Sequence, residues 1–120
     1  MDISDYLENA WLDTLRGNPF SVSAVYMSLH SDDPGEDGAN EISGDGYARV
    51  QVIFNAPSEG SMAMASPVEF PNMPNVTVTH VGLWDSATGG NFLLRGALSS
   101  PVDIPAGFTL RITALTISLD

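Results

Sequence analysis

The 120-residue chain carries 15 acidic and 4 basic residues, which gives a formal net charge of −11. Such an acidic chain lacks the clustered Lys and Arg that neutralise the phosphates of nucleic acids. It has no basic amphipathic helix that would bind a membrane surface and no apolar run of about 18 residues that would span a membrane. It contains no cysteine, which excludes a disulfide framework and thiol catalysis in a chain whose length predicts one domain, residues 1–120.

The first predicted element is an amphipathic helix over about residues 3–16. Its apolar positions fall on one stripe at Ile3, Leu7, Ala10, Trp11 and Leu15. Asp2 or Ser4 is placed to cap the start, and Gly17 and Pro19 end the helix. We expect the stripe to pack on the core, with docking on a neighbouring subunit as the alternative. The start of the chain is acidic from its second residue, unlike a secretory signal, so we expect no Sec export.

After the helix, the apolar period changes from 3.6 to 2, which predicts strands. The predicted strands lie in residues 22–30, 47–54, 66–70, 76–84, 91–98 and 108–119. A bulge is expected to bend the last of them near Ala114. Turn residues separate most of these runs, so the pattern predicts a mainly β chain, an antiparallel β-sandwich or jelly-roll-like domain over about residues 21–120.

Residues 31–46 are an acidic, glycine-rich segment that we expect to be a long loop, and loops of this length are usually functional or mobile. An EF-hand register that starts at Asp33 fails, because Gly35 and Gly44 stand where the third and twelfth positions need ligands. A non-standard oxygen cage remains as an alternative, built from Asp32, Asp33, Asp37 and Glu41. We expect a solvated loop with no metal and no cofactor.

No catalytic motif is recognisable. The only histidines are His30 and His80, and neither has the local spacing of a zinc site. The chain lacks a Gly-x-Ser-x-Gly nucleophile elbow, and no glycine-rich phosphate loop precedes a helix. We therefore predict that the protein is not an enzyme.

One predicted hairpin, residues 78–98, gathers several residues of site-forming types. On its first strand, alternation places Val76, Val78, His80 and Trp84 on one face. Gly82 lies between the two aromatic residues and leaves room for a bulky group to cross the strand. On its second strand, Arg95 is expected to pair with Asp85 or a neighbouring acid. We interpret these residues as structural.

Several segments carry a resemblance to a known family. GYARVQVIF (46–54), PVEFP (67–71), VTVTHVGLWDSATGGNFLLRGALSSPVDIPAGFTLRI (76–112) and LTISLD (115–120) resemble a family of small bacteriophage virion proteins. That family has a Tyr-Ala-Arg strand and a hairpin of the form THxGLxDAATGGNLLxxGAL. The acidic segment HSDDPGEDGANEISGDGYAR and the helix YLENAWLDTLRG also resemble theirs. The departures are Phe108, where the family has Asp, and the Met-rich SMAMASP.

The resemblance implies a non-enzymatic virion structural protein, made in the host bacterial cytoplasm and placed on the capsid exterior or the tail. Such proteins are commonly called tail fibre proteins, and related small β-proteins decorate or cement capsids, often as trimers. We predict a capsid decoration protein that binds the major capsid protein, because one short domain lacks the shaft of a fibre. The alternatives are a tail or collar fibre component that contacts a host receptor and, third, a small hydrolase or carbohydrate-binding module.

The low charge content favours self-association. Only 16% of the residues are charged, against about 25% in ordinary domains, and we expect a homo-oligomer. The resemblance implies that this oligomer is a trimer. The predicted interface residues are Tyr6, Trp11 and Leu15 on the helix, and Asp32, Asp33, Glu36 and Asp37 in the acidic loop. The four carboxylates are expected to meet basic residues of the capsid.

Overall fold

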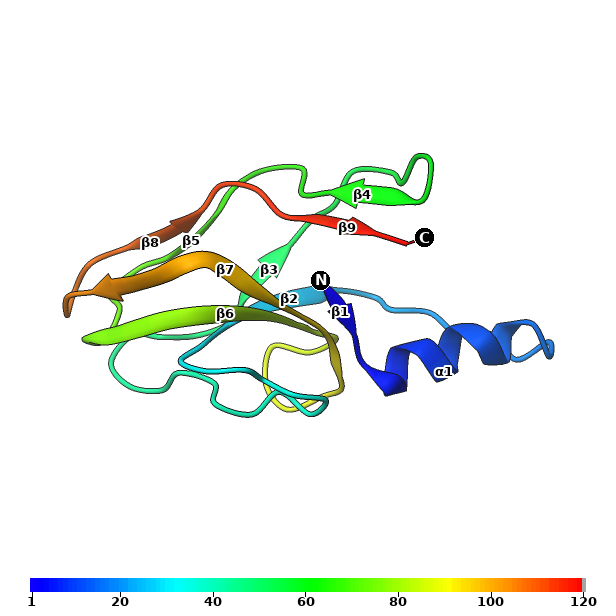
Figure 1. Ribbon diagram of the computed structural model, residues 1–120, viewed down its shortest axis with the longest axis horizontal. Helices are drawn as coiled ribbons and strands as arrows, with labels where there is room; N and C mark the ends of the chain where they lie inside the picture. The colour runs from blue at the N-terminus through cyan, green and yellow to red at the C-terminus, as the bar shows by residue number, and fades with distance from the viewer. Residues whose placement is uncertain (120) are drawn as a thin grey trace.

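The computed structural model describes residues 1–119, as a chain of antiparallel strands preceded by one helix (Figure 1). The elements are β1 (Asp2–Ile3), α1 (Asp5–Thr14), β2 (Val25–His30), β3 (Val50–Val52), β4 (Ser61–Ala63), β5 (Val68–Phe70), β6 (Val76–Trp84), β7 (Phe92–Ile104), β8 (Leu110–Ile112) and β9 (Thr116–Ser118). The predicted mainly β chain with antiparallel sheets and an N-terminal helix is confirmed. Asp120, the last residue of the predicted domain, lies outside the described residues.

The strands form two layers of unequal width. The first is a five-stranded sheet in the order β1-β7-β6-β2-β3, and the second consists of the pairs β4-β9 and β5-β8. Backbone hydrogen bonds join the layers beyond β3, where Asn55 N donates to Ala63 O and Ala65 N donates to Ile53 O. The bend predicted near Ala114 separates β8 from β9. Sequence reasoning missed β1 and β4, which are too short to show a period.

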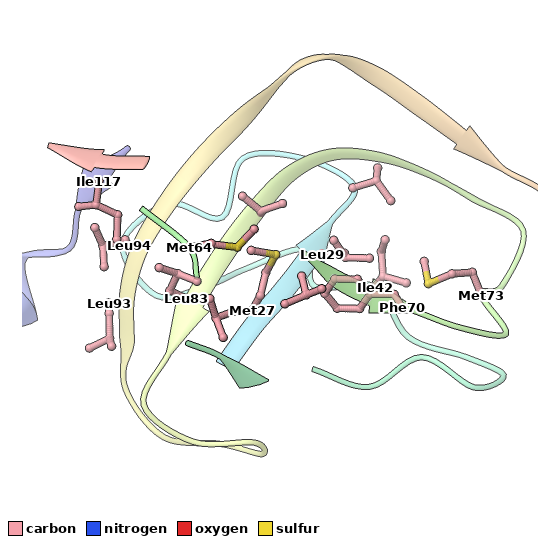
Figure 2. Close-up of a cluster of buried hydrophobic side chains, with 14 of the residues drawn as sticks. Met27, Leu29, Ile42, Met64, Phe70, Met73, Leu83, Leu93, Leu94 and Ile117 are labelled. Carbon is pink, nitrogen blue, oxygen red and sulfur yellow. The ribbon is translucent and has the colours of Figure 1, made fainter. Parts of the chain in front are cut away.

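The core lies between the two layers. Met27, Leu29 and Leu83 of the wide sheet are fully buried, and Figure 2 shows them near Phe70 and Met64 of the narrow layer. Methionines fill irregular gaps because their side chains are unbranched and flexible. The Met-rich segment that departs from the family pattern thus contributes to the core through Met64.

The predicted assignment of β6 side chains to its two faces is wrong, because a bulge interrupts the pairing of β6 with β7. Val78 pairs with Val102, but His80 pairs with Ala97, so residues 98–101 lie opposite Thr79 alone. The bulge shifts the alternation by one residue, and a one-residue shift exchanges the two faces of a strand. Val78 therefore joins the core cluster rather than the face that carries His80, as the uninterrupted alternation predicted.

The helix is anchored at its start and projects from the sheets at its end (Figure 1). Ser4, one of the two predicted caps, accepts a hydrogen bond from Leu7 N through its Oγ, which itself donates to Phe92 O at 2.7 Å. Leu7 is the buried residue of α1, whereas Trp11 is 37% exposed and Leu15 is 84% exposed. The prediction that the whole apolar stripe packs on the core is thus wrong, because the helix runs past the end of the sheet. No helix within residues 1–119 has the length and apolarity to cross a membrane.

Candidate functional site

A buried arginine holds together the loops at one end of the wide sheet. Arg49 Nε and Nη2 donate to the two carboxylate oxygens of Glu41 at 3.0 and 2.9 Å. Its Nη1 donates to the carbonyls of Ser86 and Gly89, and its guanidinium carbon lies 3.7 Å from the centre of a Trp84 ring. The Arg49 side chain is 9% exposed. It therefore joins the acidic segment to the 85–91 hairpin loop.

Tyr47 also binds Glu41, from the side that faces the core. Its hydroxyl donates to Glu41 at 2.8 Å, accepts from Leu29 N at 3.0 Å, and its ring stacks on Phe70. Burial raises the pKa of the Tyr47 hydroxyl well above its usual range. Burial would raise the pKa of Glu41 too, but the hydrogen bonds from Arg49 and Tyr47 outweigh it and hold that pKa below its usual value. Glu41 is therefore ionised in the folded chain at neutral pH.

A second buried network centres on His30. Its Nδ1 donates to Ala39 O at 2.8 Å, and its Nε2 lies 2.6 Å from Ser28 Oγ, which accepts from Trp84 Nε1 at 2.8 Å. Because Ala39 O can only accept, Nδ1 carries the proton of the neutral ring and Ser28 donates to Nε2. The Ser28–His30 contact has the form of a nucleophile and its base. Both side chains are 0% exposed, so substrate has no access to this pair.

Acid is expected to destabilise the fold through His30. Burial lowers the pKa of this imidazole, partly offset by its bond to Ala39 O. The unfolded chain, with a histidine pKa of about 6.5, then binds a proton before the folded chain does. The free energy of unfolding should fall as pH drops below about 6.5, measured as urea midpoints from pH 7.5 to 5. His30→Asn should flatten that slope and His80→Asn should keep it; equal slopes in both variants would contradict the assignment.

The predicted acidic contacts are all on the surface. They are Asp32, Asp33, Glu36 and Asp37. Two of them already have a partner within the chain, since Arg95 lies 3.6 Å from Asp33 and 3.5 Å from Glu36. A backbone hydrogen bond from Gly35 lowers the pKa of Asp33. Within residues 1–119, no group of three or more His, Cys, Asp or Glu side chains is placed to hold a metal ion.

The acidic segment is packed beneath its exposed carboxylates. Pro34 and Ile42 are buried, and Gly38 lies so close to Trp84 that an added Cβ would stand 2.3 Å from the ring. The segment therefore covers one face of the wide sheet. The predicted solvation holds for most of the segment and not for Pro34, Gly38 and Ile42, which are buried.

Two charged residues of the predicted hairpin, Asp85 and Arg95, make contacts within the chain. Arg95 pairs with Asp2, Asp33 and Glu36 and not with Asp85. Asp85 instead accepts from the backbone and side-chain nitrogens of Asn91, which closes the hairpin loop.

One of the predicted helix contacts, Trp11, borders an open apolar surface, whereas Leu15 does not line it. Trp11 lines a groove of about 290 Å³ whose floor includes Leu83 and Leu94, and a hollow of about 500 Å³ between α1 and β9. Tyr6 is half-exposed with its ring edge against Phe20. The sequence analysis did not include Leu12, which is 63% exposed, among the contact residues. A leucine on the otherwise polar side of the predicted helix was the signal that could have identified it. This surface, and not a polar cleft, is the candidate functional site.

Trp11→Ala is expected to destabilise the fold by about 2 kcal/mol, less than for a fully buried tryptophan, because Trp11 is 37% exposed. Leu15→Ala is the matched control on the same helix and should change the free energy of unfolding by less than about 0.5 kcal/mol. Urea unfolding of both variants measures the difference. Equal losses would show that Trp11 does not support the groove.

Comparison with known proteins places the chain in a family. The family model described as Podophage GP4 fiber I protein gp80 matches residues 2–120. The chain belongs to this family of phage fibre proteins. The match confirms the resemblance to phage virion proteins, and the fibre family is a structural one rather than an enzyme family. A search of curated proteins found no match.

Proposed function

We propose that this member of the fibre family is a non-enzymatic component of a fibre on the virion surface, on the tail or collar. The match to the fibre model over residues 2–120 carries this proposal. The internal chemistry supports it, because the buried charged and polar groups of Arg49, Glu41 and His30 all contact other groups of the chain. Their bonds rigidify the loops that they join.

Capsid decoration, the location preferred from the sequence, remains a second candidate. The argument for it is that a short domain has no shaft of its own. The projecting helix weakens that argument, since exposed Leu12 and Leu15 give a short domain the means to join other subunits. We propose Tyr6, Trp11 and Leu15 as contacts between subunits, and the acidic loop as a contact for a basic partner in the virion.

Copy number tests the location. The protein is quantified in purified virions against the major capsid protein by stained gel or mass spectrometry, and its position is marked by immunogold labelling. A few to a few dozen copies at the tail or collar support the fibre component. Hundreds of copies over the capsid would instead support decoration, and complete absence from purified particles would overturn the structural role.

A further inference from the structure

The outer side of α1 has a symmetric arrangement of charge and apolar surface. Leu12 and Leu15 are 63% and 84% exposed, and Glu8 and Arg16 flank them. Leu12 lies four residues from each of these charges, so Glu8 and Arg16 flank it by about one helical turn on either side. Arg16 follows the end of α1 at Thr14, in the turn after the C-cap Leu15. Its side chain pairs with Asp13 at 2.9 Å within the chain, a solvent-exposed ion pair that the contact proposed below replaces. We call Glu8, Asn9, Leu12, Leu15 and Arg16 the α1 face.

We propose that the α1 face binds the α1 face of a second copy of this chain, in an antiparallel pair with its two-fold axis at Leu12. In this register Leu12 meets its own symmetry mate, and Glu8 of each copy lies opposite Arg16 of the other. An isologous two-fold contact requires such self-complementarity. The charges favour this arrangement, because each pairing of Glu8 with Arg16 occurs twice.

The same charges oppose the alternatives. A parallel pair, or a parallel three-helix contact, would bring Glu8 beside Glu8 in a helix that also carries Asp5 and Asp13. Like charges that face each other across a contact cost free energy. An antiparallel pair with its two-fold axis one turn earlier, at Glu8, would also place Glu8 opposite Glu8. The two-fold pair therefore replaces the expected trimer as the contact that α1 makes.

The surface shape supports the same register. Leu15 of one copy lies opposite Asn9 of the other, and Asn9 lines the hollow of about 500 Å³ between α1 and β9, beside Leu12 and Leu119. A highly exposed leucine thus faces a hollow edged by apolar side chains. Because α1 projects beyond the sheets (Figure 1), antiparallel helices place the two β bodies at opposite ends. A helix pair is smaller than the standard interface of about 800 Å² per partner, so we expect a dissociation constant in the micromolar range.

Charge exchange tests the register in the isolated full chain. Sedimentation velocity from about 1 to 200 μM should show a monomer–dimer equilibrium for the native protein. Glu8→Arg and Arg16→Glu should each raise the dissociation constant about tenfold, since each removes two ion pairs and adds two repulsions. The double exchange E8R/R16E should restore dimerisation to within about threefold of the native value. A trimer, a protein monomeric throughout this range, or a double variant as weak as the singles would overturn the proposal.

The absence of native cysteine allows a second test that does not rely on affinity. Leu12→Cys places two thiols at the two-fold axis, so mild oxidation should join most of the chain into covalent dimers. Phe108→Cys is the matched control, since Phe108 is similarly exposed (61%) and lies in the turn between β7 and β8. Equal crosslinking of the two variants would overturn the pair.

The pairing deepens the proposed fibre role, because it names a contact between subunits. The proposed dimer and the proposed fibre role can be contradicted independently of each other. Copy number in virions tests the location without reference to dimers, and the charge exchange tests the dimer without virions.

Discussion

Arg49→Ala is expected to lower the free energy of unfolding by about 3 kcal/mol. Removing one partner of a largely buried ion pair leaves the other charge without compensation, which costs about 3–5 kcal/mol. The lower end applies because the Glu41 side chain is 24% exposed. The substitution also frees the carbonyls of Ser86 and Gly89 and removes the cation from the face of Trp84.

Two controls separate this network from charge alone. Arg16→Ala removes an arginine whose side chain is 78% exposed and pairs with Asp13, and it should cost less than about 0.5 kcal/mol. Arg49→Lys keeps the charge but cannot bond both oxygens of Glu41 and two carbonyls, so it should recover only part of the loss. Urea unfolding followed by tryptophan fluorescence measures all three variants. An Arg49→Lys variant as stable as the native chain would contradict the role of the guanidinium geometry.

The main elements could be predicted from the sequence because they depend on local pattern. The period-two runs became β2, β3, β5 and β6, and Ser4 caps the helix as one of two predicted candidates. The bulge opposite Thr79 could not be predicted, since it depends on how β7 pairs with β6 rather than on either strand alone. The exposure of Trp11 was missed for a similar reason: amphipathicity marks an apolar side but not how far the sheet extends beneath it.

The buried networks were beyond sequence reasoning for a different reason. Arg49 contacts Glu41 and Gly89, which lie 8 and 40 residues away along the chain. Nothing in the spacing of these residues marks them as partners. The Tyr47-Ala48-Arg49 segment is one of the features that resemble the phage family, and the structure shows what two of its side chains bind. Tyr47 and Arg49, the first and third residues of that segment, both bind Glu41.

Gly82→Ala is expected to destabilise the fold by about 3 kcal/mol, because the added methyl group has no space. A Cβ at this position would lie 2.6 Å from Phe92 Cε1, 2.8 Å from Ser28 Oγ and 2.9 Å from His30 Nε2. The room that the sequence predicted at Gly82 is thus filled by the ring of Phe92. Because Ser28 and His30 each hold fixed hydrogen bonds, neither can move without losing one.

Gly96→Ala is the matched control, one strand away on β7 and close to the same register. There the nearest atom to an added Cβ is Met1 Cγ at 3.1 Å, in the unbranched side chain of the first residue. That side chain can move aside, so the control should change the free energy of unfolding by less than about 1 kcal/mol. Thermal unfolding followed by circular dichroism compares the two. A control as damaging as Gly82→Ala would assign the loss to the general cost of a side chain in these strands, whereas the expected difference assigns it to the contact between Phe92 and the His30 network.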